Sequence, residues 1–303
     1  MLIALRWALF TDLSILFGLP LLLVFVSGQG RGARYCAVPP FIYGTVACAG
    51  IIASLAGFLW QAAAMAGTTP SDVDTSLLST VVLETSLGWA LIARIAVLAA
   101  VGVVIAVPAI RARGRGVLIG VSALALATLA WSGHGAADEG LRGWIHLGTD
   151  IVHLLAAGAW VGALVGFVWL VGMSKAAPDN WSDLTHHALA AFATMGTVLV
   201  GSLVVTGVLN FYFIVGFESW TAVAATTYGQ LLLMKLILFA AMLVLAAVNR
   251  FNLTPALGIA DSGLLRGKAL RRLRRSLVLE LSLALAVVAL VAWFGTLSPQ
   301  GPS

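Results

Sequence analysis

The chain has 303 residues, of which 61% are hydrophobic and only 10% are charged. A soluble domain is usually about a quarter charged, so this composition excludes an ordinary soluble enzyme and indicates a polytopic membrane protein. The formal net charge of +5 is no evidence for a nucleic-acid partner, because Lys and Arg gather in the cytoplasmic loops of membrane proteins. The two cysteines, Cys36 and Cys48, are too few for a disulfide framework.

Eight stretches are apolar and long enough to cross a bilayer, which needs about 20 apolar residues. In chain order, the sequence predicts membrane helices at 5–28, 41–66, 86–110, 116–133, 145–173, 188–216, 228–249 and 276–296. The first run is too long for a signal peptide, and no A-x-A cleavage site follows it. The expected fold class is all-α, a polytopic membrane helix bundle of eight transmembrane helices, and residues 1–303 are expected to form a single membrane domain.

The basic residues predict the orientation of this bundle. If the N-terminus is outside, the inner segments hold thirteen of the seventeen Lys and Arg residues: Arg31, Arg34, Arg111, Arg113, Arg115, Lys175, Arg250, Arg266, Lys268, Arg271, Arg272, Arg274 and Arg275. Positive charge in short loops marks the cytoplasmic side, so both termini are expected on the outer, periplasmic side. The basic segment 250–275 is expected to be a loop that contacts the lipids of the inner leaflet.

The predicted fifth helix carries a polar face. On a helix of 3.6 residues per turn, positions i, i+4, i+7 and i+14 lie on one side, and these positions hold His146, Asp150, His153 and Trp160. Neutral imidazoles suit copper, zinc, iron and nickel. We therefore expect His146, Asp150 and His153 to bind a metal ion, and Trp160 to form a wall of the pocket.

The opposite side of the same helix carries small residues at steps of four, Gly158, Gly162 and Gly166. Small residues at this spacing let a neighbouring helix approach closely in lipid. One side of this helix is thus expected to serve packing and the other polar chemistry.

Other ionisable residues lie in the predicted spans. Asp12, Arg94 and Lys235, like Asp150 and His153, fall within about two turns of the outer end of their helices. Ionisable groups in hydrocarbon are costly and mark either a functional site or a structural pair. The sequence predicts a polar pocket open to the outer face, with nothing comparable in the inner half. For Asp12, Arg94 and Lys235, the competing interpretation is mutual neutralisation together with snorkelling of the long side chains to the membrane surface.

A further histidine, His134, lies just after the predicted fourth helix in a glycine-flanked turn, SGHG, which could fold it back over the pocket. His186 and His187, at the inner start of the sixth helix, point about 100° apart and are poor joint ligands. The chain carries no HExxH, GxSxG, P-loop or Gly-rich nucleotide turn, so no enzymatic activity is expected.

Two motifs now indicate a family. The run SGHG…DIVHLLAAGAWVGAL, followed by YGQLLLMKLILFAAMLVLAAVNRFNLTPAL at 228–257, resembles the CopD family of bacterial copper-resistance and copper-uptake membrane proteins. The resemblance is best over 130–296, the CopD-like portion. It implies a multi-pass inner-membrane protein that moves copper from the periplasm toward the cytoplasm, beside a periplasmic CopC-like copper-binding protein.

Carried onto this chain, the resemblance implies copper ligation by His134 and His153, with Asp150 and Trp160 at flanking motif positions. His146 is added by helix geometry alone. The expected bound species is thus copper, and the expected partners are the CopC-like protein and the lipid membrane. The sequence leaves a homodimer open.

Two alternative functions remain at this stage. A b-type haem protein would need two deep histidines on facing helices, and only His153 is clearly deep. A copper-delivery or assembly factor that docks CopC-like proteins would bind copper without moving it across the membrane.

Overall fold

The structure is a computed structural model, which describes residues 1–28, 38–108, 115–132, 140–173, 181–217, 220–259 and 263–297. These segments hold helices and turns and no β-strand. The all-α fold class is therefore confirmed for the described part of the chain.

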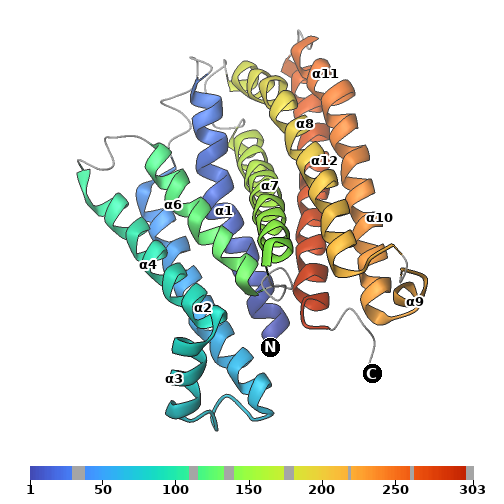
Figure 1. The fold of residues 1–303 in the computed structure, drawn as a ribbon. Helices are drawn as coiled ribbons and strands as arrows, with labels where there is room; N and C mark the ends of the chain where they lie inside the picture. Colours follow the sequence, from blue (N-terminus) through green and yellow to red (C-terminus); the bar gives the residue numbers. More distant parts are fainter. Residues whose placement is uncertain are drawn as a thin grey trace.

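The long helices run roughly antiparallel to one another, with the short α3 and α9 at one end of the bundle (Figure 1). In chain order they are α1 (Leu2–Gly28), α2 (Pro40–Ala66), α3 (Thr75–Glu84), α4 (Ser86–Ala106), α6 (Arg115–Ala127), the 3₁₀ turn η1 (Thr128–Ser132), α7 (Gly140–Met173), α8 (Trp181–Ile214), α9 (Trp220–Ala224), α10 (Thr227–Val248), the π-helical turn η3 (Asn249–Leu253), α11 (Thr254–Ile259) and α12 (Gly263–Phe294).

Among the described residues, seven helices are long and apolar enough to cross a membrane. They cover Leu2–Val26, Pro40–Ala66, Ser86–Ala106, Gly140–Met173, Thr185–Ile214, Thr227–Ile259 and Leu264–Phe294. The predicted fourth span corresponds to α6 and η1, an apolar but shorter stretch, Gly116–Ser132. Seven of the eight predicted spans are thus recovered, and the predicted fourth span stays a prediction.

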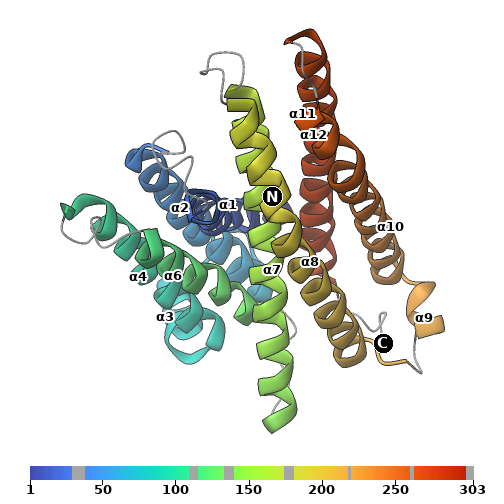
Figure 2. The same ribbon diagram turned by 90° about the horizontal axis from the view of Figure 1, so that it is seen from above.

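Helix α7 lies between two groups of helices (Figures 1 and 2). On one side stand α1, α2, α4 and α6, and on the other stand α8, α10 and α12. Helix α7 packs mainly on α1 and α8 and also on α12. The helix with the polar face therefore reaches both halves of the bundle.

The glycines of α7 pack against α1 as expected. A Cβ added at Gly162 would overlap the backbone of Gly18 in α1, and one added at Gly158 or Gly166 would meet Leu126 or Leu22. The absence of side chains lets the two helices touch along their backbones. The prediction of a packing face on this helix is confirmed.

Two predicted loops are partly helical. The segment 67–85 contains α3, whose first turn is capped by Asp74: its carboxylate accepts a hydrogen bond from the Leu77 backbone N–H. This bond, with a second one from the Ser76 hydroxyl, holds the pKa of Asp74 below its ordinary value.

The segment 250–275 is helical over η3, α11 and the first half of α12. This basic segment was expected to be a loop at the inner leaflet. Lys, Arg, Leu and Ala are all strong helix formers, so the backbone continues as a helix beyond the apolar span.

Candidate functional site

The polar face of α7 is joined to α8 by two side-chain hydrogen bonds. The Asp150 Oδ1 atom accepts a hydrogen bond of 2.6 Å from Asn210 Nδ2, and His153 Nδ1 lies 2.8 Å from Thr206 Oγ1. Along α7, His153 follows Asp150 by about one turn, and along the antiparallel α8, Thr206 precedes Asn210 by about one turn. Neighbouring turns of α7 and α8 therefore face each other here.

The Thr206 hydroxyl determines which ring nitrogen of His153 carries the proton. A threonine hydroxyl has one hydrogen, and that of Thr206 donates to the Ser202 carbonyl at 2.6 Å. His153 Nδ1 must therefore be the donor in its contact with Thr206. This tautomer leaves the lone pair of Nε2 as a ligand for a metal ion.

His153 lines a cavity of about 210 Å³ whose walls come from α1, η1, α7, α8, α10 and α12. Asp150 and Asn210 line the same cavity, as do Tyr228 and Lys235 from α10. The Lys235 ammonium lies 5.6 Å from the centre of the Phe294 ring. The structure thus brings together Asp150, His153 and Lys235, three of the residues that the sequence singled out.

His146 is placed differently. Its ring is 1% exposed and stacks on Phe213 of α8, with ring centres 5.0 Å apart and planes inclined by 20°. It is not among the residues that line the cavity of His153. The shared helix face is real, but His146 sits one to two turns nearer the Gly140 end, where Phe213 covers it.

Within the described ranges, no three His, Cys, Asp or Glu side chains lie close enough together to hold a metal ion. His134, expected to complete the ligand set, lies in 133–139, outside the described residues. The set His134, His146, Asp150 and His153 therefore stays a prediction.

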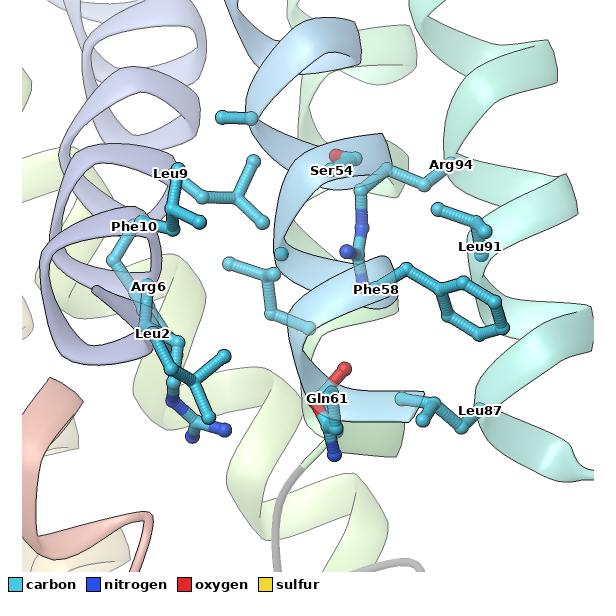
Figure 3. Close-up of a pocket in the computed structure, with 15 residues that line it drawn as sticks. Leu2, Arg6, Leu9, Phe10, Ser54, Phe58, Gln61, Leu87, Leu91 and Arg94 are labelled. Carbon is cyan, nitrogen blue, oxygen red and sulfur yellow. The ribbon is translucent and has the colours of Figure 1, made fainter. Parts of the chain in front are cut away.

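Arg94 and Asp12 lie away from this cavity. Arg94 lines a separate pocket between α1, α2 and α4, where it faces Ser54 and Phe58 of α2 (Figure 3). Its guanidinium donates to Thr128 through Nε at 2.8 Å and Nη2 at 3.1 Å. Arg94 is neutralised neither by Asp12 nor, among the described residues, by any other carboxylate.

The interpretation that Asp12, Arg94 and Lys235 neutralise one another is therefore wrong. Asp12 Oδ2 is buried without a hydrogen-bond partner among the described residues, close to Gly50 of α2. Equal depth along the sequence does not place side chains together: Lys235 on α10 belongs to the other group of helices (Figure 2), and Arg94, in the same group as Asp12, is bonded to Thr128.

A buried carboxylate escaped the sequence analysis. Glu280 in α12 is 3% exposed, and its two oxygens accept hydrogen bonds from Trp160 Nε1 at 3.0 Å and Asn249 Nδ2 at 2.8 Å. The expectation that the inner half holds nothing comparable is wrong. The sequence did contain a signal, because Glu280 is the one acidic residue in the predicted span 276–296. Its position near the expected start of that helix suggested a residue at the membrane surface rather than a buried one.

Three cavities form a row along α7. A second cavity, of about 430 Å³, shares His153 and Lys235 with the first and reaches Trp160. A third, of about 260 Å³, is lined by Trp160, Glu280 and Asn249. Trp160 lines a cavity together with His153 and also lines the cavity beside Glu280; its role as the wall of a metal pocket stays a prediction.

The other described histidines, His186 and His187, are in direct ring contact with each other near the Trp181 end of α8. That end is far from Thr206, which contacts His153. The described histidines therefore offer no facing pair on two helices of the kind that a bis-histidine haem requires.

Comparison with known proteins identifies the family. Residues 1–144 match the model of the copper resistance protein D-like N-terminal domain, and residues 186–294 match that of copper resistance protein D. The resemblance thus includes the first four predicted helices. Asp150, His153 and Trp160 lie between the two matched ranges, whereas Glu280 lies in the second.

Three curated proteins are similar in sequence to this chain. The chain is 40% identical to copper resistance protein D of Pseudomonas syringae pv. tomato over 98% of this chain and 96% of that protein. It is 34% identical to inner membrane protein YebZ of Escherichia coli (strain K12) over 62% of each chain. It is 31% identical to copper transport protein CutJ of Bacillus subtilis (strain 168) over 57% of this chain and 29% of that protein.

No solved structure matches this chain. The two family models, the relative that is similar over nearly the whole length, and the apolar helices all point the same way. The chain belongs to the copper resistance protein D family and is a multi-pass inner-membrane protein connected with copper.

Proposed function

We propose that this protein takes copper from the periplasm toward the cytoplasm through the cavity that Asp150 and His153 line. The observation that carries the proposal is the hydrogen-bonded geometry of His153. Because its Nδ1–H donates to Thr206, its Nε2 keeps a free lone pair, and the ring borders a cavity of about 210 Å³ that the Asp150 carboxylate also lines. Imidazole and carboxylate are donors that Cu(II) accepts readily.

The proposed ligand set is His153 and Asp150, with His134 added from outside the described residues. His146 joins this set only when its ring leaves the stack on Phe213. Lys235 and Trp160 act as polar support and cavity wall. Arg94 supports the bundle from the pocket between α1, α2 and α4, and Asp12 does so beside Gly50 of α2.

The proposed orientation places the Gly140 end of α7 at the periplasm. It assumes eight membrane crossings, with α6 and η1 as the fourth. The beginning of α1 and the end of α12 lie at the same end of the bundle, as an even number of crossings requires (Figure 1). The basic first half of α12 then faces the cytoplasm, in keeping with the positive-inside rule.

A periplasmic CopC-like protein is the proposed copper donor. This partner follows from the family resemblance, and the copper names of two relatives support a role in copper handling. Copper would reach His134 and the cavity of His153 from the periplasmic end of α7.

The deciding experiment is the copper content and the optical spectrum of the purified protein, beside the His153→Ala variant and a His187→Ala control. We expect stoichiometric copper in the native protein and the control, and its loss in His153→Ala. Full copper in His153→Ala would overturn the site. A haem spectrum would overturn the proposal in favour of a b-type haem protein. Copper binding to the purified protein without copper uptake by cells that express it would favour an assembly factor.

A further inference from the structure

Glu280 is held by two neutral donors. Trp160 Nε1 on α7 donates to its Oε1 at 3.0 Å, and Asn249 Nδ2 in η3 donates to its Oε2 at 2.8 Å. The residue is 3% exposed and lies within the apolar span Leu264–Phe294. Neither donor brings a positive charge to this carboxyl group.

The described neighbours provide no counter-ion. Arg250 is the one charged residue that shares the cavity with Glu280. Its Nη1 donates to Thr197 Oγ1 at 2.7 Å and to the Ala193 carbonyl at 3.3 Å, and its guanidinium lies 5.2 Å from the centre of the Phe251 ring. A carboxylate in hydrocarbon without a cation is costly, so Glu280 requires neutralisation by a proton or a metal ion.

The surrounding atoms favour the proton. Glu280 is hydrogen-bonded to Trp160 and Asn249. Besides the Glu280 oxygens, these three side chains offer a metal ion one further oxygen, Asn249 Oδ1, which is buried without a hydrogen-bond partner among the described residues. Copper prefers imidazole and sulfur ligands, and the residues lining this cavity include no His, Cys or Met. A protonated carboxyl group, by contrast, needs one acceptor for its O–H, and the Asn249 amide supplies Oδ1 when it turns over.

The backbone at this point is also unusual. Asn249 begins the π-helical turn η3, and its own side chain is 6% exposed. Single π turns inside α-helices occur often at functional sites. The turn places the Asn249 amide against Glu280, in the third cavity of the row that starts at His153.

We propose that Glu280 exchanges a proton against the copper cation that passes the neighbouring cavity. The step is Glu280–COOH to Glu280–COO⁻ plus H⁺, and it occurs when copper lies beside Trp160. The proton leaves through the third cavity and returns when copper has gone, so the carboxyl group is neutralised by the proton while copper is absent and by the charge of the copper ion while it is present. This inference rests on the proposed copper passage, and it identifies the coupled ion as H⁺.

The first test needs no copper. The infrared spectrum of the purified protein near neutral pH should show the C=O band of a protonated carboxyl group that shifts in D₂O. Glu280→Gln should lack this band, and Glu84→Gln, which changes an exposed carboxylate at the end of α3, should keep it. Identical carboxyl bands in Glu280→Gln and native protein would overturn the proposal.

The second test measures coupling in proteoliposomes that enclose a pH-sensitive dye. Copper added outside should drive a proton flux through native protein and Glu84→Gln. In Glu280→Gln the copper-driven proton flux should fall to that of protein-free liposomes. Copper binding at the His153 site should stay within about twofold, because Glu280 does not line the cavity that His153 and Asp150 share. An undiminished proton flux in Glu280→Gln would overturn the proposal.

The two tests separate the two proposals. Glu280→Gln keeps the shape of the side chain and an acceptor for Trp160, so loss of the fold is not expected. Trp160→Phe, which removes one donor and keeps Glu280, should shift the infrared band rather than abolish it. If native protein carries no copper, the proposed function fails, and the infrared test still decides whether Glu280 holds a proton.

Discussion

His153 depends on Thr206 for its tautomer and orientation. The Nδ1–H···Oγ1 contact of 2.8 Å fixes the ring, and the second hydrogen bond of Thr206 to Ser202 determines its direction. Residues that orient a metal-binding histidine in this way tune affinity without touching the metal. Thr206 is therefore a positioning residue of the proposed copper site.

We predict that Thr206→Val lowers copper affinity about 10- to 100-fold, the usual effect of losing such an orienting partner. Titration of the purified protein with copper measures the change. Thr206→Ser should restore the hydroxyl and the affinity. Thr45→Val, which removes an exposed hydroxyl bonded to its own helix, should leave affinity unchanged, and equal affinity in both valine variants would contradict the role of Thr206.

At the scale of the element, α7 combines two opposite demands. Its glycine side lies directly against the backbone of α1, while its polar side faces the cavities between α8, α10 and α12. Close packing on one side holds the helix rigidly, so that Asp150 and His153 keep their register with Asn210 and Thr206.

We predict that Gly162→Ala destabilises the protein by about 1–3 kcal/mol, because the added methyl group overlaps Gly18 and forces the helices apart. Thermal unfolding in detergent measures the effect. Gly102→Ala in α4 is the matched control, since an added Cβ there meets nothing within 4 Å. A Gly162→Ala protein as stable as the Gly102→Ala protein would refute the close contact.

At the scale of the molecule, α7 is the central helix of two helix groups (Figure 2). The row of cavities follows it from Asp150 to Glu280. Under the proposed function, copper would pass polar groups at two levels of this row, and the direction of passage would depend on the orientation of the bundle in the membrane.

We predict that, in a Cys36→Ser/Cys48→Ser background, Ser71→Cys reacts with a membrane-impermeant thiol reagent on intact spheroplasts. Lys268→Cys should react only after the membrane is opened. Both positions are exposed, so accessibility reports the side of the membrane. Labelling of Lys268→Cys in intact spheroplasts would reverse the proposed orientation.

The sequence by itself determined the class of fold and the two faces of α7. Apolar runs of about 20 residues can only be membrane helices, and a period of 3.6 residues places Asp150 and His153 on one side and the glycines on the other. These are local properties, and they do not depend on which helices become neighbours.

Only the tertiary structure decided which polar residues meet. Arg94 turned out to bond Thr128, His146 to stack on Phe213, and Glu280 to accept hydrogen bonds from Trp160 and Asn249. The partners in these contacts come from different helices, up to 120 residues apart in the case of Trp160 and Glu280. Sequence periodicity gives the depth and the face of a side chain, but the rotation and packing of the helices determine what that face touches.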